Sequence, residues 1–403
     1  MSINLNFKFA NQQQDFFVTL NQRVNQYFKT KNIERTGNSE MVIKTIVMFS
    51  IYFIPYFVLI SGVVSSAWGM LGLCVIMGFG LAGIGLSIMH DANHGSYSNK
   101  PWVNNLLGLS LNLVGGHDTN WKVQHNVLHH TYTNVHDVDE DISPRGIIRM
   151  APESKWKPIH KFQHYYAWFF YGFMTLVWVI TKDFDRLVKY QREGLLKKQR
   201  TTATREWMIM IATKTVYYTY IAVIPMLLLD VTFGQVVIGF FVMHYIGGFI
   251  LAMIFQPAHV VEGTEYPMPD ENGNLENSWA IHQLRTTTNF GHRAKFFSWY
   301  VGGLNYQVEH HLFPNICHVH YREIAQIVET TAKEFGLPYK SKKTFREAVV
   351  AHAKQLRVLA QKPKPALPMP EFLPLLHNQK VQLNTSLSTA TDFISPNPSE
   401  WVW

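Results

Sequence analysis

The sequence predicts an all-α integral membrane protein in which four transmembrane helices form two hairpins. Three features indicate this fold class: two long stretches almost without charge, a low charge content, and histidine clusters beside these stretches. Charged residues make up 16% of the 403 residues, well below the roughly 25% usual in soluble domains. Aromatic residues reach 14%. The mean hydropathy of −0.04 predicts that the spans are few and that a large polar part accompanies them.

The net charge and the cysteines exclude several classes of protein. The formal charge is +8, but no basic run interleaved with aromatic residues indicates nucleic-acid binding. Anionic lipid headgroups, an acidic redox partner or a phosphate-bearing substrate suit this charge better, as do ordinary cytoplasmic flanking charges. Cys74 and Cys317 make no disulfide framework and lack the spacing of a zinc ribbon.

The first hairpin follows a polar segment, residues 1–40, which lacks the basic start, apolar centre and cleavage site of a signal peptide. Thr45–Met89 contains no charged residue. Because one span needs about 20 apolar residues, this stretch is long enough for two. We predict spans at about 45–63 and 69–89, the second rich in glycine, which allows close helix packing.

The second hairpin is predicted at about 207–229 and 231–255, with a turn at Asp230. Lys214 lies about two turns from the end of its helix, and we expect its ammonium group to snorkel to the interface. His244 falls in mid-span, where it either lines a substrate tunnel or makes an interhelical hydrogen bond. Between the hairpins, Tyr165–Ile180 is apolar but too short to span, so it lies along the interface or re-enters the membrane.

The distribution of basic residues predicts the orientation of the chain. Neither Thr45–Met89 nor Thr215–Ala258 contains lysine or arginine. With two complete hairpins, all basic residues then lie on one side, which the positive-inside rule makes cytoplasmic. We predict one functional domain at residues 41–360. A mobile tail at 361–403 follows, since the composition turns to proline, serine, threonine and asparagine.

Three histidine-rich clusters lie on the predicted cytoplasmic side. Two of them contain histidines four residues apart, and on a helix this spacing places both rings on one face. The clusters are His90 and His94; His125, His129 and His130; and Gln307, His310 and His311. His259, just after the fourth predicted span, is a further candidate ligand. Since catalytic zinc takes three protein ligands, so many imidazoles indicate two ions of octahedral type, with iron, copper, zinc and nickel all open.

The position of this site narrows its chemistry. A pair of redox metals at the membrane surface, beside helices that shelter a lipid chain, suits oxygen-dependent attack on unactivated C–H bonds. Asp91, Asp137 and Asp139 are candidates to accept hydrogen bonds from the outer nitrogens of ligand histidines, and we favour Asp91.

The motifs themselves match a known pattern. His-x-x-x-His, His-x-x-x-His-His and Gln-x-x-His-His, in this order around two hairpins, resemble those of the membrane-bound fatty acid desaturases. Gln307 in place of the first histidine of the third motif resembles the front-end subfamily, whose members insert a double bond between the carboxyl end and an existing double bond. The resemblance runs from about His90 to His320 and includes the stretch Asn305–Pro314.

This resemblance implies four spans with a cytosolic helical cap, a non-haem di-iron centre, molecular oxygen as co-substrate, and an acyl chain carried on coenzyme A or a phospholipid. Four other histidines have no role in it and are expected to be structural: His117, His282, His318 and His320. The implied metal ligands are His90, His94, His125, His129, His130, His259, Gln307, His310 and His311.

The chain departs from many front-end desaturases because it lacks the His-Pro-Gly-Gly tetrapeptide of a fused b-type cytochrome domain. We therefore expect a separate electron donor, either a ferredoxin or a b-type cytochrome. The same departure favours a bacterial inner membrane over the endoplasmic reticulum.

Other functions compete with an oxygen-dependent front-end desaturase. A di-iron lipid hydroxylase and a sphingolipid desaturase would use similar sites, so both stay open. A membrane metalloprotease would need His-Glu-x-x-His, but position 91 is aspartate. A metal transporter would place its histidines and acids in the middle of the spans. In this chain only His244 and Lys214 lie there.

Overall fold

A computed structural model of the chain describes residues 7–11, 13–142 and 146–363. Part of the predicted polar segment, residues 1–6 and 12, lies outside the described residues, as does the predicted tail from residue 364 onward. The described residues are mostly helical, and their few strands form two-residue parallel pairs.

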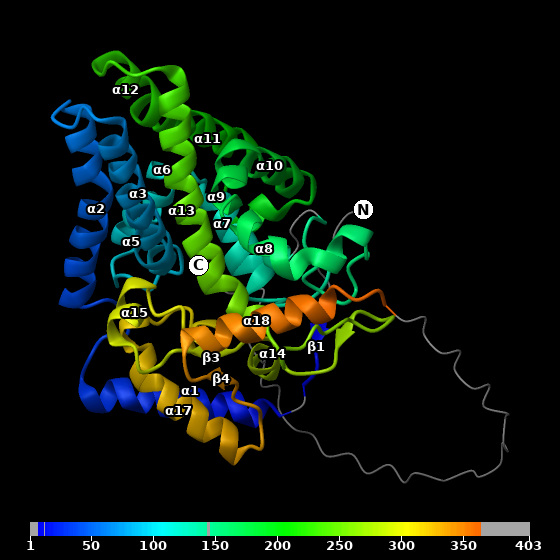
Figure 1. Cartoon of the computed structure of the whole chain (residues 1–403). Helices are drawn as coiled ribbons and strands as arrows, with labels where there is room; N and C mark the ends of the chain where they lie inside the picture. The colour runs from blue at the N-terminus through cyan, green and yellow to red at the C-terminus, as the bar shows by residue number, and fades with distance from the viewer. Residues whose placement is uncertain (1–6, 12, 143–145, 364–403) are drawn as a thin grey trace, which may run out of the picture.

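Four helices of the described chain are long and apolar enough to cross a membrane, which confirms the predicted all-α class with four spans. They pack as two hairpins whose connecting turns lie near each other, at the top of Figure 1. In chain order the spans are α2 (Ser39–Ile60); α3 (Ala67–Gly83) continued by η1 (Ile84–Ile88) and α4 (Met89–Asn93); α11 (Ala203–Tyr218) continued by η7 (Thr219–Val223) and α12 (Ile224–Leu228); and α13 (Phe233–His259).

Polar side chains at the helix starts explain where these spans begin. The side chain of Asn38 accepts a hydrogen bond from the backbone N–H of Glu40 at the start of α2. Thr232 and Gln235 cap α13 reciprocally. The second and fourth spans continue beyond their predicted ends, so His90 and His259 both lie in the last turns of membrane helices.

Glycines let the second span pack closely against its neighbours. A Cβ atom added at Gly80 would lie 2.6 Å from the backbone nitrogen of Tyr52 in α2. One added at Gly78 would lie 2.8 Å from the carbonyl oxygen of Met243 in α13. The second span therefore lies between α2 and α13.

The apolar stretch between the hairpins packs against the fourth span. It forms α8 (Gln163–Tyr171), α9 (Met174–Val177) and the π-helical turn η5 (Trp178–Lys182). The Thr175 hydroxyl donates a hydrogen bond of 2.7 Å to the carbonyl oxygen of His244, in the middle of the fourth span. This contact favours re-entry over a position along the interface, the two predicted placements.

The prediction that Lys214 snorkels to the interface is wrong. Its side chain is buried, and its Nζ donates to the carbonyl oxygens of Gly115 and Val179 at 2.9 and 3.0 Å. It also forms an ion pair of 2.9 Å with the buried carboxylate of Asp183, the first residue of α10 (Asp183–Arg192). The partner supplied by α10 makes the interior a better place for this ammonium than the interface.

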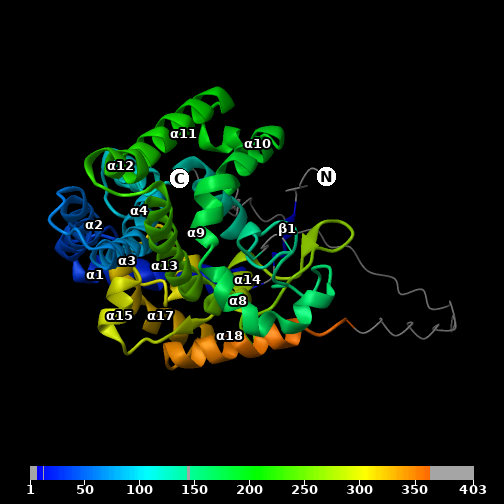
Figure 2. The ribbon, with the colours of Figure 1, turned by 45° about the horizontal axis from the view of Figure 1, so that its top comes forward.

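The N-terminal segment and the elements that follow the fourth span build most of a cap at the end of the spans opposite α12 (Figures 1 and 2). Its α1 (Gln14–Lys31) packs against α17 (Tyr321–Glu334) with buried Phe16, Leu20, Val24 and Phe28, which recur every four residues. The other helices of the cap and of the linking segments are α5 (Pro101–Gly108), α6 (Ser110–Leu113), α7 (Asp118–Trp121), η2 (Lys122–His129), η3 (Glu140–Ile142), η4 (Pro158–Phe162), η6 (Leu195–Gln199), α14 (Trp279–Thr286), α15 (Lys295–Tyr300), α16 (Gln307–Leu312), η8 (His318–His320) and α18 (Phe345–Leu359).

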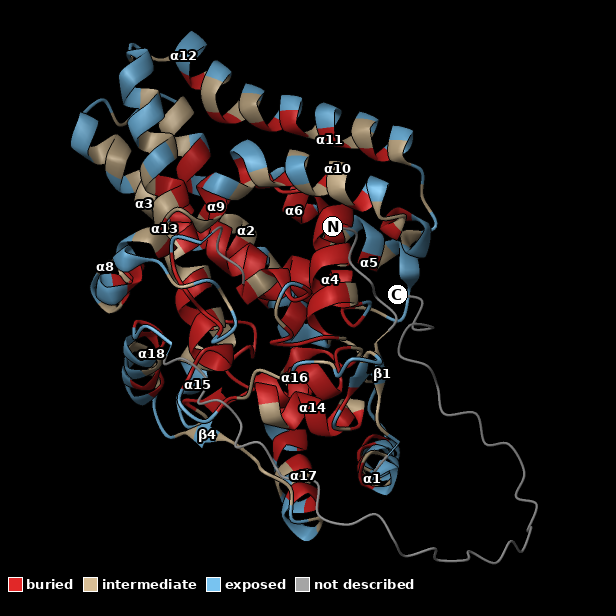
Figure 3. Ribbon diagram, turned by 90° about the vertical axis from the view of Figure 1, so that its right-hand side faces the viewer, coloured by how far each residue is buried: buried red, intermediate tan, exposed pale blue. Residues whose placement is uncertain are grey.

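Two parallel strand pairs tie distant parts of the cap together. β1 (Lys8–Phe9) pairs with β2 (Asn274–Leu275), and β3 (Asn289–Phe290) pairs with β4 (Ser341–Lys342). Figure 3 shows that buried residues concentrate around α4, α14 and α16, whereas α11 and α12 carry many exposed ones. The most enclosed part of the molecule is therefore the junction between the spans and the cap.

Candidate metal centre

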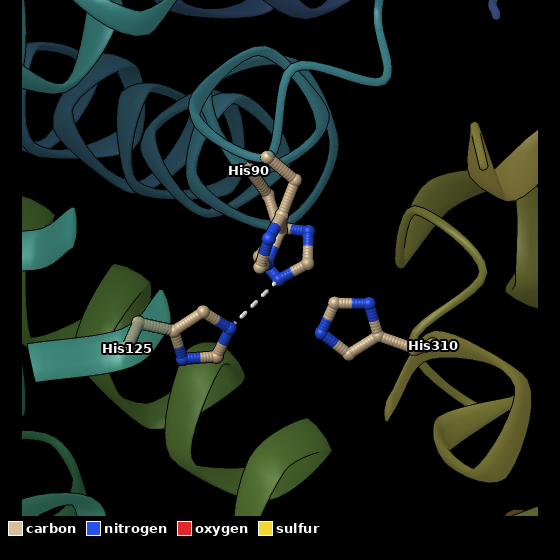
Figure 4. A group of neighbouring side chains, drawn as sticks. His90, His125 and His310 are labelled. Atoms are coloured by element: carbon tan, nitrogen blue, oxygen red, sulfur yellow. Dashed lines mark hydrogen bonds between the residues drawn. The ribbon is translucent and has the colours of Figure 1, made fainter. Parts of the chain in front are cut away.

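The histidines of the first two clusters are carried by helices that contain π-helical turns. His90 and His94 follow η1, and His125 and His129 belong to η2. Single π-turns inside α-helices occur frequently at functional sites, because the wider turn re-aims side chains. In Figure 4 the rings of His90, His125 and His310 point toward one another from three different elements.

The ring nitrogens in this first group lie at the spacing that a metal ion requires. The Nε2 atoms of His90 and His130 each lie 3.2 Å from Nε2 of His125. Nε2 of His130 lies 2.9 Å from Nε2 of His310. Two imidazole nitrogens bound at 90° to each other, with metal–nitrogen bonds of about 2.1 Å, are about 3 Å apart. The residues present therefore fit a six-coordinate type of ion.

A second group lies beside the first. His129, His259 and His311 bring one ring nitrogen each within 4.8 Å of one another. Nε2 of His129 is buried and has no hydrogen-bond partner among the described residues. Such an atom is costly to bury unless it binds something. A cation coordinated by the three rings would satisfy it.

Gln307 lies next to this second group. Its amide nitrogen is 2.9 Å from Nε2 of His259 and 3.5 Å from Nε2 of His311. A flip of the side-chain amide exchanges its oxygen and nitrogen, so the same geometry presents Oε1 to a cation between these rings. His130 links the two groups, because its ring nitrogen is close to those of both His310 and His311. The structure thus brings together all the residues predicted as ligands from the sequence.

The outer nitrogens of two of these histidines contact carboxylates. Nδ1 of His129 lies 2.9 Å from Oδ2 of Asp139, and Nδ1 of His125 lies 3.3 Å from Oδ2 of Asp141. Carboxylates in this position orient the ring and raise its basicity as a ligand. Asp139 was among the predicted candidates. Asp141 was overlooked, although the acidic run that follows the second cluster contains it.

The preference for Asp91 was wrong. Its Oδ1 lies 3.8 Å from Nδ1 of His90, which is too long for a hydrogen bond. Its Oδ2 instead lies 2.7 Å from Nδ1 of His318 and accepts a hydrogen bond of 2.9 Å from the thiol of Cys317. The side chain of Asp137 is 89% exposed, and its Oδ1 lies 3.5 Å from Nε2 of His136. Asp91 therefore ties α4 to the cap, and Asp137 has no contact with the cluster.

Two further hydrogen-bond partners of the clustered histidines lie in segments where no sequence motif predicted a role. Oε1 of Gln283, in α14, lies 2.9 Å from Nδ1 of His311. The hydroxyl of Tyr321, at the start of α17, lies 3.2 Å from Nδ1 of His310. Neither residue belongs to a motif, and only the packing of α14 and α17 against α16 brings them to the site.

Burial keeps most histidines of the cluster neutral. It lowers the pKa of His125 to about 3, although the hydrogen bond to Asp141 acts in the opposite direction. Burial and the neighbouring imidazoles lower the pKa of His130, His310 and His311 well below the usual value. A neutral ring keeps a lone pair free for a metal ion. His129 is the exception: despite its burial, the carboxylates of Asp139 and Asp141 raise its pKa.

The remaining histidines bond to protein groups. Nε2 of His282 lies 2.8 Å from the carbonyl oxygen of Thr133, and Nε2 of His320 lies 3.1 Å from that of Thr36. The ring of His117 accepts a hydrogen bond from a backbone N–H at the start of α7. Together with His318, they make the structural contacts that were expected. His244 makes interhelical hydrogen bonds, to Tyr217 and Thr175.

An apolar cavity adjoins the cluster. Its volume is about 90 Å³, and His90, His125 and Gln307 line its end. The rest of its wall is almost entirely apolar and comes from several elements: Leu81, Gly85, Leu86, Met89, Leu111, Val114, Gly116, Trp121, Met174, Trp178, Val179, Leu251, Phe255 and Leu304. Such a cavity can hold a hydrocarbon chain against the histidines.

Comparisons with known proteins agree with this architecture. Residues 66–343 match the fatty acid desaturase family. The sn-1 linoleoyl-lipid 6-desaturase of Synechocystis is 36% identical over 352 residues, which cover 87% of this chain and 97% of the relative. The protein of the same name from Arthrospira platensis is 35% identical, covering 86% and 92%. The acyl-lipid (8-3)-desaturase of Physcomitrium patens is 36% identical over 86% of this chain and 72% of the relative.

Proposed function

This chain belongs to the fatty acid desaturase family, and we propose that it is a front-end acyl-lipid desaturase of unsaturated fatty acid biosynthesis. It places a cis double bond between the carboxyl end and an existing double bond of a C18 acyl chain. The observation that carries this proposal is the buried histidine cluster at the end of an apolar cavity. Gln307 in that cluster and the names of the relatives support the front-end position of the new bond.

The proposed cofactor is a pair of iron ions. His90, His94, His125 and His310, with His130, would hold one ion, and His129, His259 and His311, with Gln307, would hold the other. Support comes from the nitrogen–nitrogen spacings near 3 Å and from the unpartnered Nε2 of His129.

The reaction removes one hydrogen atom from each of two neighbouring carbons. These two hydrogen atoms, two electrons and two protons reduce one molecule of oxygen to two molecules of water. When bound, the iron pair supplies the oxidising power that an unactivated C–H bond requires. The apolar cavity holds the chain beside His90 and His125 and keeps bulk water away. Asp139 and Asp141 hold the rings of His129 and His125 in place.

The substrate carrier, the electron donor and the membrane complete the proposal. We propose an acyl group on a membrane lipid rather than on coenzyme A, following the printed names of the relatives. A separate ferredoxin or b-type cytochrome supplies the electrons. The cap faces the cytoplasm of a bacterial inner membrane, in line with the absence of lysine and arginine from Thr45–Met89 and Thr215–Ala258.

The test is to express the protein together with a compatible donor in cells fed linoleate and to locate double bonds in the lipids by mass spectrometry. His310→Ala is the control. A new double bond on the carboxyl side, absent from the control, supports the proposal. A hydroxyl group at that position would favour the hydroxylase, and a product confined to sphingoid chains would favour the sphingolipid desaturase. No product with a functional donor present would overturn the proposal.

A further inference from the structure

A second apolar cavity lies in line with the one beside the metal cluster. Its volume is about 240 Å³, and it lies between the two hairpins, at their far ends. Along α3, Leu81 lines the cavity beside the metal cluster, and Met77, one turn farther from His90, lines the second one. Along α13, Leu251 and Met243 lie in the same order. We call the two spaces the near cavity and the far cavity.

Tyr217 and His244 lie at the level where the lining changes from one cavity to the other. The ring of His244 packs 4.5 Å, between centroids, from Phe240 of the far cavity. Its Nδ1 lies 3.1 Å from the hydroxyl of Thr175, which lines the near cavity. His244 therefore touches the wall of each cavity.

The ring of Tyr217 closes the same level from the opposite side. It packs against Gly115, where an added Cβ would lie 2.7 Å from the ring, and both chain neighbours of Gly115 line the near cavity. Ile221, one turn farther along the third span, lines the far cavity. The hydroxyl of Tyr217 lies 2.5 Å from Nε2 of His244, and both side chains are fully buried. The two rings thus lie between the walls of the two cavities, although neither ring lines a cavity itself. We call this pair the partition.

A polar pair is an expensive choice for this position. Polar side chains in the membrane-spanning part of a protein are costly, and they therefore mark functional positions by default. Here each ring nitrogen of His244 has a partner, which holds the partition in a single arrangement. Apolar side chains would separate the cavities less rigidly, because no directional bonds would fix them.

The near cavity is deep enough to hold part of a fatty acyl chain. Leu81 lies about 13 Å from His90 along the helix axis, close to the roughly 15 Å of hydrocarbon in one leaflet of a bilayer. We propose that the partition of Tyr217 and His244 is the stop that limits the length of the acyl chain beyond the metal centre. The methyl end of a C18 substrate stops at the wall that this partition supports, and longer chains are excluded from the far cavity. This inference rests on the proposed desaturase function.

The test compares chain lengths within each variant, so that differences in protein yield cancel. Membranes with the electron donor receive equal amounts of C18 and C20 substrates, and mass spectrometry gives the ratio of desaturated products. His244→Ala and Tyr217→Ala each remove one half of the partition. In both we expect the C20 to C18 ratio to rise by about tenfold or more, since one methylene in an apolar pocket is worth 10–200-fold in discrimination.

Two further variants control for indirect effects. Tyr217→Phe keeps the bulk of the ring but removes its hydrogen bond to His244, so its ratio should rise much less than that of Tyr217→Ala. Ile221→Phe narrows the far cavity directly behind the partition, and in the His244→Ala background it should reverse the gain. A wild-type ratio in both opening variants would overturn the inference, and so would an equal shift in Tyr217→Phe. An absence of products from the wild-type protein would instead count against the proposed function.

Discussion

The carboxylate of Asp139 lies 2.9 Å from Nδ1 of His129, and both side chains are fully buried. The same carboxylate oxygen accepts a hydrogen bond of 2.8 Å from the backbone N–H of Asn134. The other oxygen accepts one of 3.0 Å from the N–H of Asp141. The loop after the second histidine cluster therefore folds around this carboxylate, and the orientation of His129 depends on it.

Asp139→Asn should weaken metal binding. The variant keeps the shape of the side chain but loses the charge that orients His129, and such a loss typically costs about 10–100-fold in metal affinity. Iron content of the purified protein and desaturation rate at saturating donor are the measurements. Asp137→Asn is the matched control, because its side chain is 89% exposed and should be neutral. Equal iron retention in the two variants would refute the role assigned to Asp139.

Lys214→Met should destabilise the protein strongly. It leaves the buried carboxylate of Asp183 without its cation, and breaking one side of a buried ion pair costs about 3–5 kcal/mol. Thermal unfolding in detergent measures the effect. Adding Asp183→Asn to this variant removes the uncompensated charge and should restore most of the stability. A near-wild-type unfolding temperature of Lys214→Met would contradict the buried ion pair and would instead support a lysine that reaches the interface.

The cap should lose stability as the pH falls, in part through His352. Burial lowers the pKa of His352 to about 4, despite a hydrogen bond between its Nδ1 and the carbonyl oxygen of Val260. In the unfolded chain the pKa is about 6.5. Between pH 6.5 and 4 the unfolded state therefore binds a proton that the folded state does not. This proton favours unfolding by up to about 1.4 kcal/mol per pH unit.

The measurement is the free energy of unfolding at several pH values between 4.5 and 7.5 for the wild type and for His352→Gln. Other buried histidines contribute to the slope in both proteins, so the difference between the two slopes isolates His352. The wild type should have the steeper dependence by up to one proton. Identical slopes would show that His352 titrates alike in the folded and unfolded states.

Gly302→Ala should disturb the helix that carries the first histidine cluster. Gly302 has a φ of +64°, and a Cβ there would lie 2.2 Å from the carbonyl oxygen of Leu86 in η1. Gly336→Ala is the matched control: its φ is +66°, but nothing lies within 4 Å of the added atom. The control should lose only about 1–2 kcal/mol of stability, which is the cost of the left-handed backbone conformation for alanine. The measurements are the unfolding temperature and the iron content of both variants. Equal effects of the two substitutions would show that contact with Leu86 does not matter.

Much of this architecture could be predicted because the signals are local. An uncharged stretch such as Thr45–Met89 is sufficient to predict a membrane hairpin, and the motif order predicted the family that the comparisons confirm. The second and fourth spans are longer than predicted, because their helices continue into the protein interior and include His90 and His259. Hydropathy reports contact with lipid, and it cannot report where a helix continues inside a cap.

The environment of the site was less predictable, because it depends on contacts between distant segments. The partners of the outer nitrogens of His125, His310 and His311 lie 16, 11 and 28 residues away in the chain. No local pattern distinguishes Asp141 from its acidic neighbours. The same holds for Lys214, whose cation is buried only because α10 places Asp183 beside it.

The sequence by itself determined the chemistry available to this protein, since the residue types and their spacing decide which side chains can bind a metal on one helix face. The tertiary structure alone decided how these side chains are oriented, which carboxylates hold them, and that Tyr217 and His244 meet between the two apolar cavities. The physical reason is that ligand identity and hydropathy belong to single segments. Hydrogen bonds and cavities arise only when several segments pack against one another.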